Sequence, residues 1–231
     1  MIDIVPELLE LIKNDFKKNI NGNKAIDRVQ KLVENGTATY KEANDLAVWT
    51  GQMLSNSLKK HITLEVLPDG KMYYNIADRV LGEMLKEDYD LVSTAAEQIQ
   101  TSMNRKAGIG LKAKKPKFNQ NRVDGLVDRL SSEEFEKVEW LLDEPIVNFS
   151  QSVVEDSIKD NAEFHDAVGL PAKIVRTVDS NPCKWCQDIA GIYEYPNVPD
   201  DVYRRHQRCR CTVEYVPKKG RRQNVWTKAL K

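Results

Sequence analysis

Residues 183–211 have the sequence CKWCQDIAGIYEYPNVPDDVYRRHQRCRC, and this stretch holds all four cysteines of the 231-residue chain. They form the pattern Cys183-x2-Cys186, followed by His206-x2-Cys209-x-Cys211. Thiolates and imidazoles are ligands that zinc prefers, and two thiolates separated by two residues can hold one tetrahedral ion from a tight turn. The stretch therefore predicts a zinc site.

The pattern offers five ligands for the four positions of a tetrahedral ion. We predict Cys183, Cys186, His206 and Cys209, because His-x2-Cys repeats the spacing of the first pair, and Cys211 competes for the last position. A shell filled by protein leaves no place for an activated water, so the predicted site is structural. A redox Cys-x2-Cys would be expected beside a thioredoxin-like βαβ pattern, which the sequence lacks, and five soft ligands in 29 residues favour a metal over an inert cysteine cluster.

Upstream of this stretch, apolar residues recur at spacings of three and four, which predicts amphipathic helices. The first predicted helix covers residues 6–20, and the second covers residues 26–33 and is ended by Asn35-Gly36. The third is capped by Thr39 and runs to Leu58, and the fourth covers residues 76–103. The fifth begins at a Ser131-x-x-Glu134 capping box and is ended by Pro145, and the sixth covers residues 146–158. Residues 62–74, around Pro68-Asp69-Gly70, predict a short β-hairpin or an extended loop.

After Gly169 and Pro171 the apolar period changes from 3.6 to 2. Residues 173–178, 192–195 and 210–216 are predicted strands. The predicted fold class is mainly α, with a helical N-terminal body followed by a small α+β zinc-binding module. We place the body at residues 1–168, with a basic break near 105–122, the module at 169–217 and a basic tail at 218–231.

Positive charge is concentrated at the C-terminal end of the chain. Lysine plus arginine and aspartate plus glutamate total 35 each, yet from Arg204 onward there are ten basic residues and one acidic residue, Glu214. Such a surface can neutralise phosphates, although a charge run is also typical of a solvated face. The residues predicted to contact nucleic acid are Arg204, Arg205, Arg208, Arg210, Lys218, Lys219, Arg221 and Arg222.

The sequence predicts no catalytic residues and no cofactor besides zinc. His61 and His165 have no serine or cysteine partner at a known spacing, so each is predicted to lie on a helix surface. No stretch approaches the roughly 20 apolar residues of a membrane span. The acidic, amphipathic start of the chain and the clustered cysteines favour a cytosol-like, reducing compartment.

Residues 181–217 resemble the C-terminal region of tailed-phage minor head proteins, the Mu F-like head morphogenesis family. The positions that carry the resemblance are Cys183, Cys186, Gly191, Pro199, His206, Cys209, Arg210 and Cys211. Residues 67–80, 104–116 and 141–159 are similar to the upstream part of minor capsid proteins encoded by prophages of Gram-positive bacteria. One departure is Gln207, since the family commonly has proline after the motif histidine.

The resemblance implies a low-copy, non-enzymatic virion component that joins the head near the portal. Its partners would be the portal or the major capsid protein and packaged double-stranded DNA. It would lie in the host cytoplasm during assembly and then inside the phage head, and some members are ejected with the DNA. The alternative is a nucleic-acid-processing or effector enzyme delivered with the phage genome. A zinc transcription factor is a third possibility, which no recognition-helix pattern supports.

Overall fold

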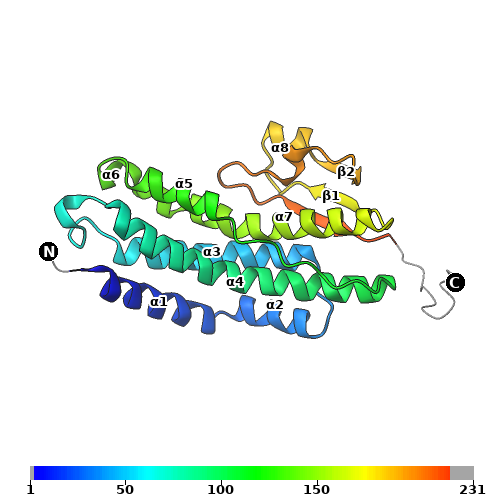
Figure 1. The fold of residues 1–231 in the computed structure, drawn as a ribbon, viewed down its shortest axis with the longest axis horizontal. Coiled ribbons are helices and arrows are strands. Elements are labelled where there is room, and N and C mark those ends of the chain that lie inside the picture. The colour runs from blue at the N-terminus through cyan, green and yellow to red at the C-terminus, as the bar shows by residue number, and fades with distance from the viewer. Residues whose placement is uncertain (1–2, 219–231) are drawn as a thin grey trace. The chain divides into compact units, whose positions relative to one another are not determined.

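The computed structural model describes residues 3–218, and most of them are helical. In chain order the elements are α1 (Val5–Asn21), α2 (Lys24–Glu34), α3 (Tyr40–His61), the 3-10 turn η1 (Pro68–Gly70), α4 (Tyr74–Ala107), α5 (Gln120–Leu130), α6 (Phe135–Val138), η2 (Glu139–Leu142), α7 (Glu144–Ala167), β1 (Lys173–Thr177), α8 (Lys184–Asp188), β2 (Gly191–Glu194), η3 (Asp200–Tyr203) and β3 (Thr212–Val216). Figure 1 labels the eight α-helices and the strands β1 and β2. The predicted fold class is therefore confirmed in its coarse form, a mainly α chain with a small sheet near its C-terminal end. Among the described residues, no helix has both the length and the apolar character that a membrane crossing requires.

The contacts of the chain define two compact units. The first unit combines the chain up to Arg28 with Leu46–Val92 and Lys117–Val153. The second unit combines Val29–Asp45, Ser93–Pro116 and the chain from Val154 onward. The helices α3, α4 and α7 each contribute one segment to each unit. All of the predicted metal ligands belong to the second unit, whereas the predicted boundaries at residues 168 and 217 stay predictions.

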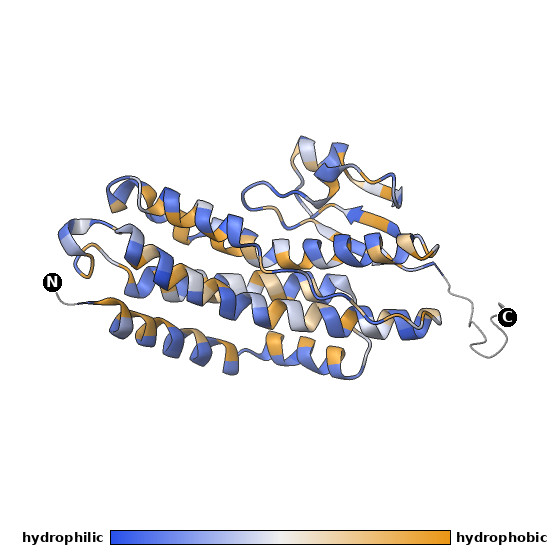
Figure 2. Cartoon of the chain, in the orientation of Figure 1, coloured by the Kyte–Doolittle hydropathy of each residue, from blue (hydrophilic) through white to orange (hydrophobic). Residues whose placement is uncertain are grey.

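The core of the first unit is built from apolar helix faces, of which α1 is the clearest case. Val5, Leu8, Ile12 and Phe16 are each at most 2% exposed, and they recur every three or four residues. Figure 2 shows the resulting alternation of hydrophobic and hydrophilic residues along α1. Full burial of one such side chain contributes about 1.5–3 kcal/mol. The helix predicted at residues 6–20 is confirmed.

The boundary between α2 and α3 follows the local signals in the sequence. Gly36 has a φ of 65°, and the N–H of Thr37 donates to the carbonyl of Leu32 at 2.8 Å, which ends α2 as predicted. Thr39 then begins α3, because its side-chain oxygen accepts from the N–H of Lys41 at 3.2 Å. The carboxylate of Glu42 in turn accepts from the N–H of Thr39 at 2.7 Å.

The prediction for residues 62–74 is wrong where it proposed a hairpin. This segment forms η1, and no strand flanks the turn at Asp69 and Gly70, whose φ angles are 52° and 66°. Leu67 and Met72, on either side of the turn, are 4% and 1% exposed. Burial of these two side chains holds the segment as a loop instead of a paired ribbon.

Two predictions for the segment before α7 have different outcomes. The helical segment before Pro145 ends at Leu142, close to the predicted end, and Pro145 itself lies in the first turn of α7, where its fixed φ and missing N–H are tolerated. Ser131 does not form the predicted capping box with Glu134, because its hydroxyl donates to the carbonyl of Val127 at 2.8 Å at the end of α5. The helix α5 itself was not predicted.

The three predicted strands are confirmed, with ends shifted by one or two residues. They form an antiparallel sheet in the order β2-β1-β3, so β1 is the central strand. Ile174 and Arg176 of β1 share one face with Val213 and Tyr215 of β3, and all four are at most 2% exposed. The sheet therefore has one buried face within the second unit, and a charged residue, Arg176, lies on that face.

Buried polar contacts join β3 to the helical part of the second unit. His165 of α7 is fully buried, and its Nδ1 contacts the hydroxyl of Tyr215. The amide nitrogen of Asn104 lies 3.4 Å from the other ring nitrogen, Nε2. Because this amide can only donate, Nε2 accepts and Nδ1 carries the proton. The predicted surface position of His165 is therefore wrong.

Candidate metal centre

The first pair of cysteines lies at the start of the short helix α8. Cys183 is the N-cap residue of α8, and its Sγ accepts from the N–H of Cys186 at 3.5 Å. The preceding loop is fixed by the side-chain amide of Gln187, which donates to the carbonyl of Pro182 at 3.0 Å. This turn brings both sulfurs to the same side of the chain, as the Cys-x2-Cys spacing predicts.

His206 reaches this pair from the loop between η3 and β3. Its Nε2 lies 3.3 Å from the Sγ of Cys183 and 3.0 Å from the Sγ of Cys186. The other ring nitrogen, Nδ1, lies 2.7 Å from the backbone carbonyl of Gln207. A carbonyl can only accept, so Nδ1 carries the proton and the lone pair of Nε2 faces the two sulfurs. This is the tautomer that binds metal, held by the kind of backbone contact that fixes metal-binding histidines.

The second pair of cysteines is buried against the first. Cys209 and Cys211 are each 2% exposed, and the Sγ of Cys209 lies 3.7 Å from the Sγ of Cys186. The turn that leads from His206 to Cys209 contains Arg208, which has a left-handed φ of 60°. The N–H of Cys209 donates to the carbonyl of His206 at 3.2 Å and closes this turn.

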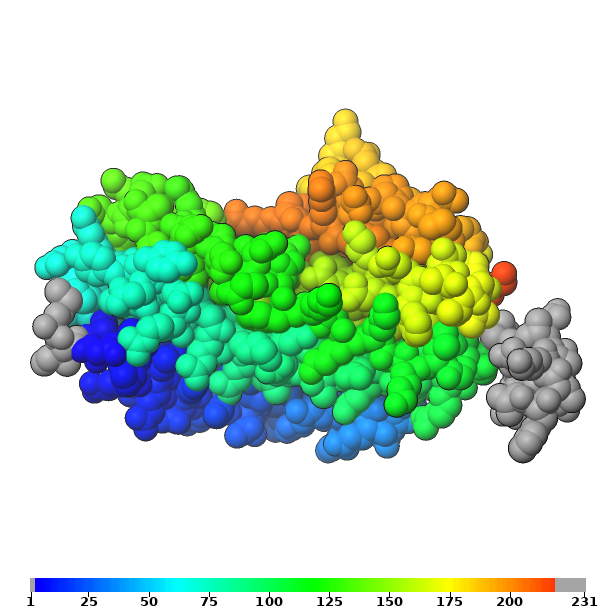
Figure 3. Space-filling view, viewed as in Figure 1, coloured from blue at the N-terminus to red at the C-terminus, as the bar shows by residue number. Residues whose placement is uncertain are grey.

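The five side chains form two overlapping groups. One group contains Cys183, Cys186 and His206, the other contains Cys186, Cys209 and Cys211, and within each the ligand atoms lie within 4.8 Å of one another. Cys183 is exposed and the other three cysteines are buried. In Figure 3 the gold atoms of the segment near residue 180 stand out from the orange atoms of the segment near residue 200. The sequence-predicted ligands are thus brought together, around Cys186 as the shared member.

Three distances in this cluster are close to those around a tetrahedral ion. Two thiolates at about 2.3 Å from such an ion lie about 3.8 Å apart, and a thiolate and an imidazole nitrogen lie about 3.6 Å apart. The observed distance between Cys186 and Cys209 is 3.7 Å, and the distances from His206 to the first two sulfurs are a few tenths of an ångström shorter than this geometry. These residues could therefore hold a metal ion of the kind that thiolates and imidazoles prefer.

Burial makes a lone thiolate unfavourable in this cluster. It raises the pKa of Cys186 to about 12, and the neighbouring Cys211 and Cys209 thiols add to the rise. Arg176 acts in the opposite direction. A cation bound among these sulfurs would supply the missing charge and displace the thiol protons.

Two buried arginines support the cluster, and neither role was predicted. Arg176 of β1 donates from Nη1 to the carbonyl of Val202 at 2.5 Å and from Nη2 to the Sγ of Cys209 at 3.7 Å. Arg205 donates from Nη1 to the carbonyl of Cys211 at 2.7 Å, and its Nε lies 2.5 Å from a carboxylate oxygen of Glu155. The sequence did contain a signal for the burial of Arg176, because the alternation of the strand KIVRT places this residue on the same face as Ile174.

The predicted nucleic-acid residues have different positions. Arg204 is exposed and forms an ion pair with Asp201 at 3.0 Å, and Arg208 and Lys218 are also exposed. Arg210 is half-buried and donates to the carbonyl of Cys209 at 3.3 Å. The side chain of Arg205 is 4% exposed and faces Glu155, so it does not contribute to the surface. Lys219, Arg221 and Arg222 lie outside the described residues.

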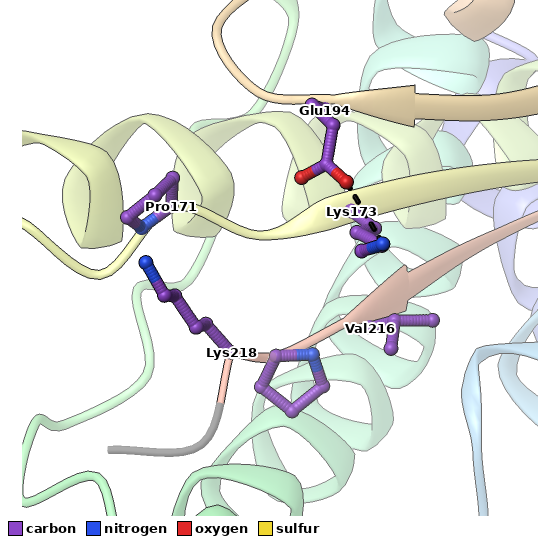
Figure 4. A pocket seen from close by; sticks show the side chains of 6 residues that line it. Pro171, Lys173, Glu194, Val216 and Lys218 are labelled. Atoms are coloured by element: carbon purple, nitrogen blue, oxygen red, sulfur yellow. Dashed lines mark ion pairs between the residues drawn. The ribbon is translucent and has the colours of Figure 1, made fainter. Parts of the chain in front are cut away.

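A shallow groove lies beside the sheet, apart from the cysteines and His206. It has a volume of about 300 Å³ and is lined by Pro171, Lys173, Glu194, Val216, Pro217 and Lys218. Lys173 and Glu194 form an ion pair at 2.8 Å across neighbouring strands, as Figure 4 shows. Of the predicted site residues that the structure describes, Lys218 lines this groove.

The Cys/His cluster is therefore the site at which the predicted residues converge. Comparisons with protein-family models, with curated proteins and with solved structures gave no match to this chain.

Proposed function

We propose that Cys183, Cys186, His206 and Cys209 hold one structural zinc ion. The observation that carries this proposal is that the ligand atoms of Cys183, Cys186 and His206 lie within 4.8 Å of one another, and that the Sγ of Cys209 lies 3.7 Å from the Sγ of Cys186. Zinc is the metal for which this set of ligands is typical. With four protein ligands the ion cross-links α8 to the segment that enters β3, and it stabilises a small sheet with little apolar core of its own.

The chain acts, on this proposal, as a non-enzymatic minor head protein of a tailed phage. Support for this role comes from the resemblance of residues 181–217 to the Mu F-like head morphogenesis family. The helical part docks on the portal or the major capsid protein inside the head. The exposed Arg204, Arg208 and Lys218 face packaged DNA, and the protein is a candidate for ejection with it.

Metal analysis of the purified full chain tests the zinc site. We expect about one zinc ion per chain, lost on substitution of Cys186 by serine together with a large part of the thermal stability. Ser180→Ala is the matched control, because Ser180 is exposed in the loop before α8 and is not a metal ligand. A Cys186→Ser variant with unchanged metal content and unchanged melting temperature would refute the proposal.

Particle assembly tests the role in the head. A tagged chain produced in the prophage host should co-sediment with heads after induction and co-purify with the portal or the major capsid protein. The competing enzymatic role is tested by incubating the purified protein with DNA and RNA. Reproducible, metal-dependent cleavage that a single acidic-residue substitution abolishes would favour a delivered enzyme over a structural component.

A further inference from the structure

We infer that Arg176 is a positioning residue of the metal centre, which holds Cys209 in the coordination shell and leaves Cys211 outside it. This inference rests on the proposed zinc site and deepens it in two respects. It decides between two cysteines that the spacing in the sequence leaves as competitors. It also assigns a role to a buried charge that the proposed function does not use.

The first step is the burial of Arg176. This residue lies on the central strand β1, is 2% exposed, and projects from the buried face of the sheet. Within residues 3–218, no carboxylate forms an ion pair with Arg176, and its Nε has no hydrogen-bond partner. A buried cation without a counter-charge is costly, so its presence indicates a negative charge nearby.

The second step is the direction of its guanidinium. One nitrogen is anchored on the carbonyl of Val202 and the other points to the Sγ of Cys209. The ring of Trp185, whose centroid lies 5.5 Å from the guanidinium carbon, holds the group from a third side. Val202 and Trp185 thus hold the guanidinium on two sides, and Nη2 lies against the Sγ of Cys209. The group also lies close to Cys186, whose pKa it lowers.

The third step is charge balance. Zinc bound by three thiolates and a neutral imidazole carries a net charge of about minus one, since three thiol protons are released on binding. One arginine beside this shell neutralises it. Arg176 contacts Cys209, so its positive charge lies directly beside one sulfur of this shell.

Cys211 is placed differently. It immediately precedes β3, whose first residue, Thr212, pairs with Thr177 of β1, so its backbone is fixed by the sheet. Its carbonyl accepts from the buried Arg205. Within the described part of the chain, no arginine N–H reaches the sulfur of Cys211. It therefore remains a buried thiol that packs against the shell.

Cobalt substitution of the full chain tests the choice of ligand, because thiolate-to-cobalt absorption reports the number of bound sulfurs. Cys211→Ser should keep one ion per chain and the absorption of the unsubstituted protein. Cys209→Ser should lose about a third of that absorption, since two thiolates remain of three. Equal losses in the two variants, or a loss confined to Cys211→Ser, would overturn the inference.

Zinc affinity, measured by competition with a chelator, tests the role of Arg176. Arg176→Gln should weaken binding about 10–100-fold while the cobalt absorption at saturation is retained. Arg176→Lys keeps the positive charge but loses the planar guanidinium. Its zinc affinity should therefore lie between that of the Arg176→Gln variant and that of the unsubstituted protein. Arg204→Gln is the control, because Arg204 is exposed and lies in the loop that leads to His206. This variant should bind zinc with the affinity of the unsubstituted protein. An Arg176→Gln affinity equal to that of this control would refute the role of Arg176.

The outcomes separate this inference from the proposal on which it rests. If the unsubstituted chain binds no metal, the zinc site itself fails. If it binds zinc and the variants at residues 176, 209 and 211 do not follow the pattern above, only the inference fails. Circular dichroism checks the fold of each variant, and should Arg176→Gln unfold, the affinity of Arg176→Lys and the pair of serine variants decide the question.

Discussion

Arg205 and Glu155 form an ion pair in which the two side chains are only 4% and 3% exposed. Glu155 belongs to α7, whereas Arg205 lies between η3 and the second pair of cysteines. Arg205 also donates to the amide oxygen of Asn44 at 2.9 Å and to the carbonyl of Cys211. One side chain thus links the segment that carries His206 and Cys209 to two helical segments of the second unit.

Removal of this arginine should destabilise the protein strongly. Arg205→Ala leaves the Glu155 carboxylate buried without its partner, which typically costs about 3–5 kcal/mol. Denaturant unfolding at neutral pH measures the effect. Arg204→Ala is the matched control, since it breaks only the exposed pair with Asp201 and should change stability by less than about 1 kcal/mol. Similar losses in the two variants would contradict the structural role given to Arg205.

Burial of His165 should make stability fall in mild acid. Burial lowers the pKa of this histidine, so between its folded pKa and about 6.5 the unfolded chain binds the proton and the folded chain does not. The folded state is therefore disfavoured as pH drops below about 6.5, by at most about 1.4 kcal/mol per pH unit. Above that pH the histidine is neutral in both states and adds no pH dependence.

Unfolding free energies at pH 7.5 and 5.0 check this prediction. His165→Gln should lower the free energy of unfolding at pH 7.5, because it disrupts the contacts with Tyr215 and Asn104. Between pH 7.5 and pH 5.0, however, the variant should lose less stability than the unsubstituted protein loses. Parallel pH profiles for the His165→Gln variant and the unsubstituted protein would show that this histidine does not titrate on unfolding.

Most of the helices and the clustering of the cysteines with His206 could be predicted from the sequence, because both depend on spacing along a short stretch of chain. The apolar face of α1, the end of α2 at Gly36 and the pairing of Cys183 with Cys186 each depend on residues that are close together in the sequence. The supporting residues could not be predicted in this way. His165 contacts Tyr215 and Arg205 contacts Glu155, each across 50 positions of sequence. Charged or polar side chains were assigned to the surface because their buried partners come from distant elements.

A buried carboxyl in the first unit gives the opposite pH dependence. Asp88 of α4 is fully buried, and burial raises its pKa to about 6, although the hydroxyls of Ser150 and Thr50 lower it. Ser150 donates its hydroxyl proton to the carbonyl of Ile146 at 3.2 Å. Thr50 likewise donates to the carbonyl of Ala47 at 3.4 Å. Neither hydroxyl thus completes a hydrogen bond to Asp88, and both carboxyl oxygens lack a partner among residues 3–218.

Replacement of this carboxyl should stabilise the protein at neutral pH. Between pH about 4 and about 6 the folded state holds the proton of Asp88 and the unfolded state does not, so stability falls as pH rises through this range. Asp88→Asn removes this pH-dependent loss of stability. The change in the free energy of unfolding caused by the substitution should therefore be more favourable at pH 7 than at pH 4, by on the order of 2 kcal/mol. Chemical unfolding at both pH values measures the difference, and Asp78→Asn, at an exposed position of α4, should show none. A neutral-pH gain no larger than the gain at pH 4 would contradict the prediction.

Two helical glycines of the first unit should respond to alanine with opposite signs. A Cβ at Gly51 of α3 would lie 2.9 Å from the Cα of Val147 and 2.6 Å from the Oγ of Ser150 in α7, so the two helices must separate to accept it. We expect Gly51→Ala to cost about 1–3 kcal/mol, the usual cost of overpacking. A Cβ at Gly82 of α4 meets no atom within 4 Å. Gly82→Ala should therefore add about 0.5–1 kcal/mol, because alanine loses less backbone entropy in a helix. Denaturant unfolding of the two variants side by side checks both signs, and stabilisation by Gly51→Ala would show that α3 and α7 do not pack this closely.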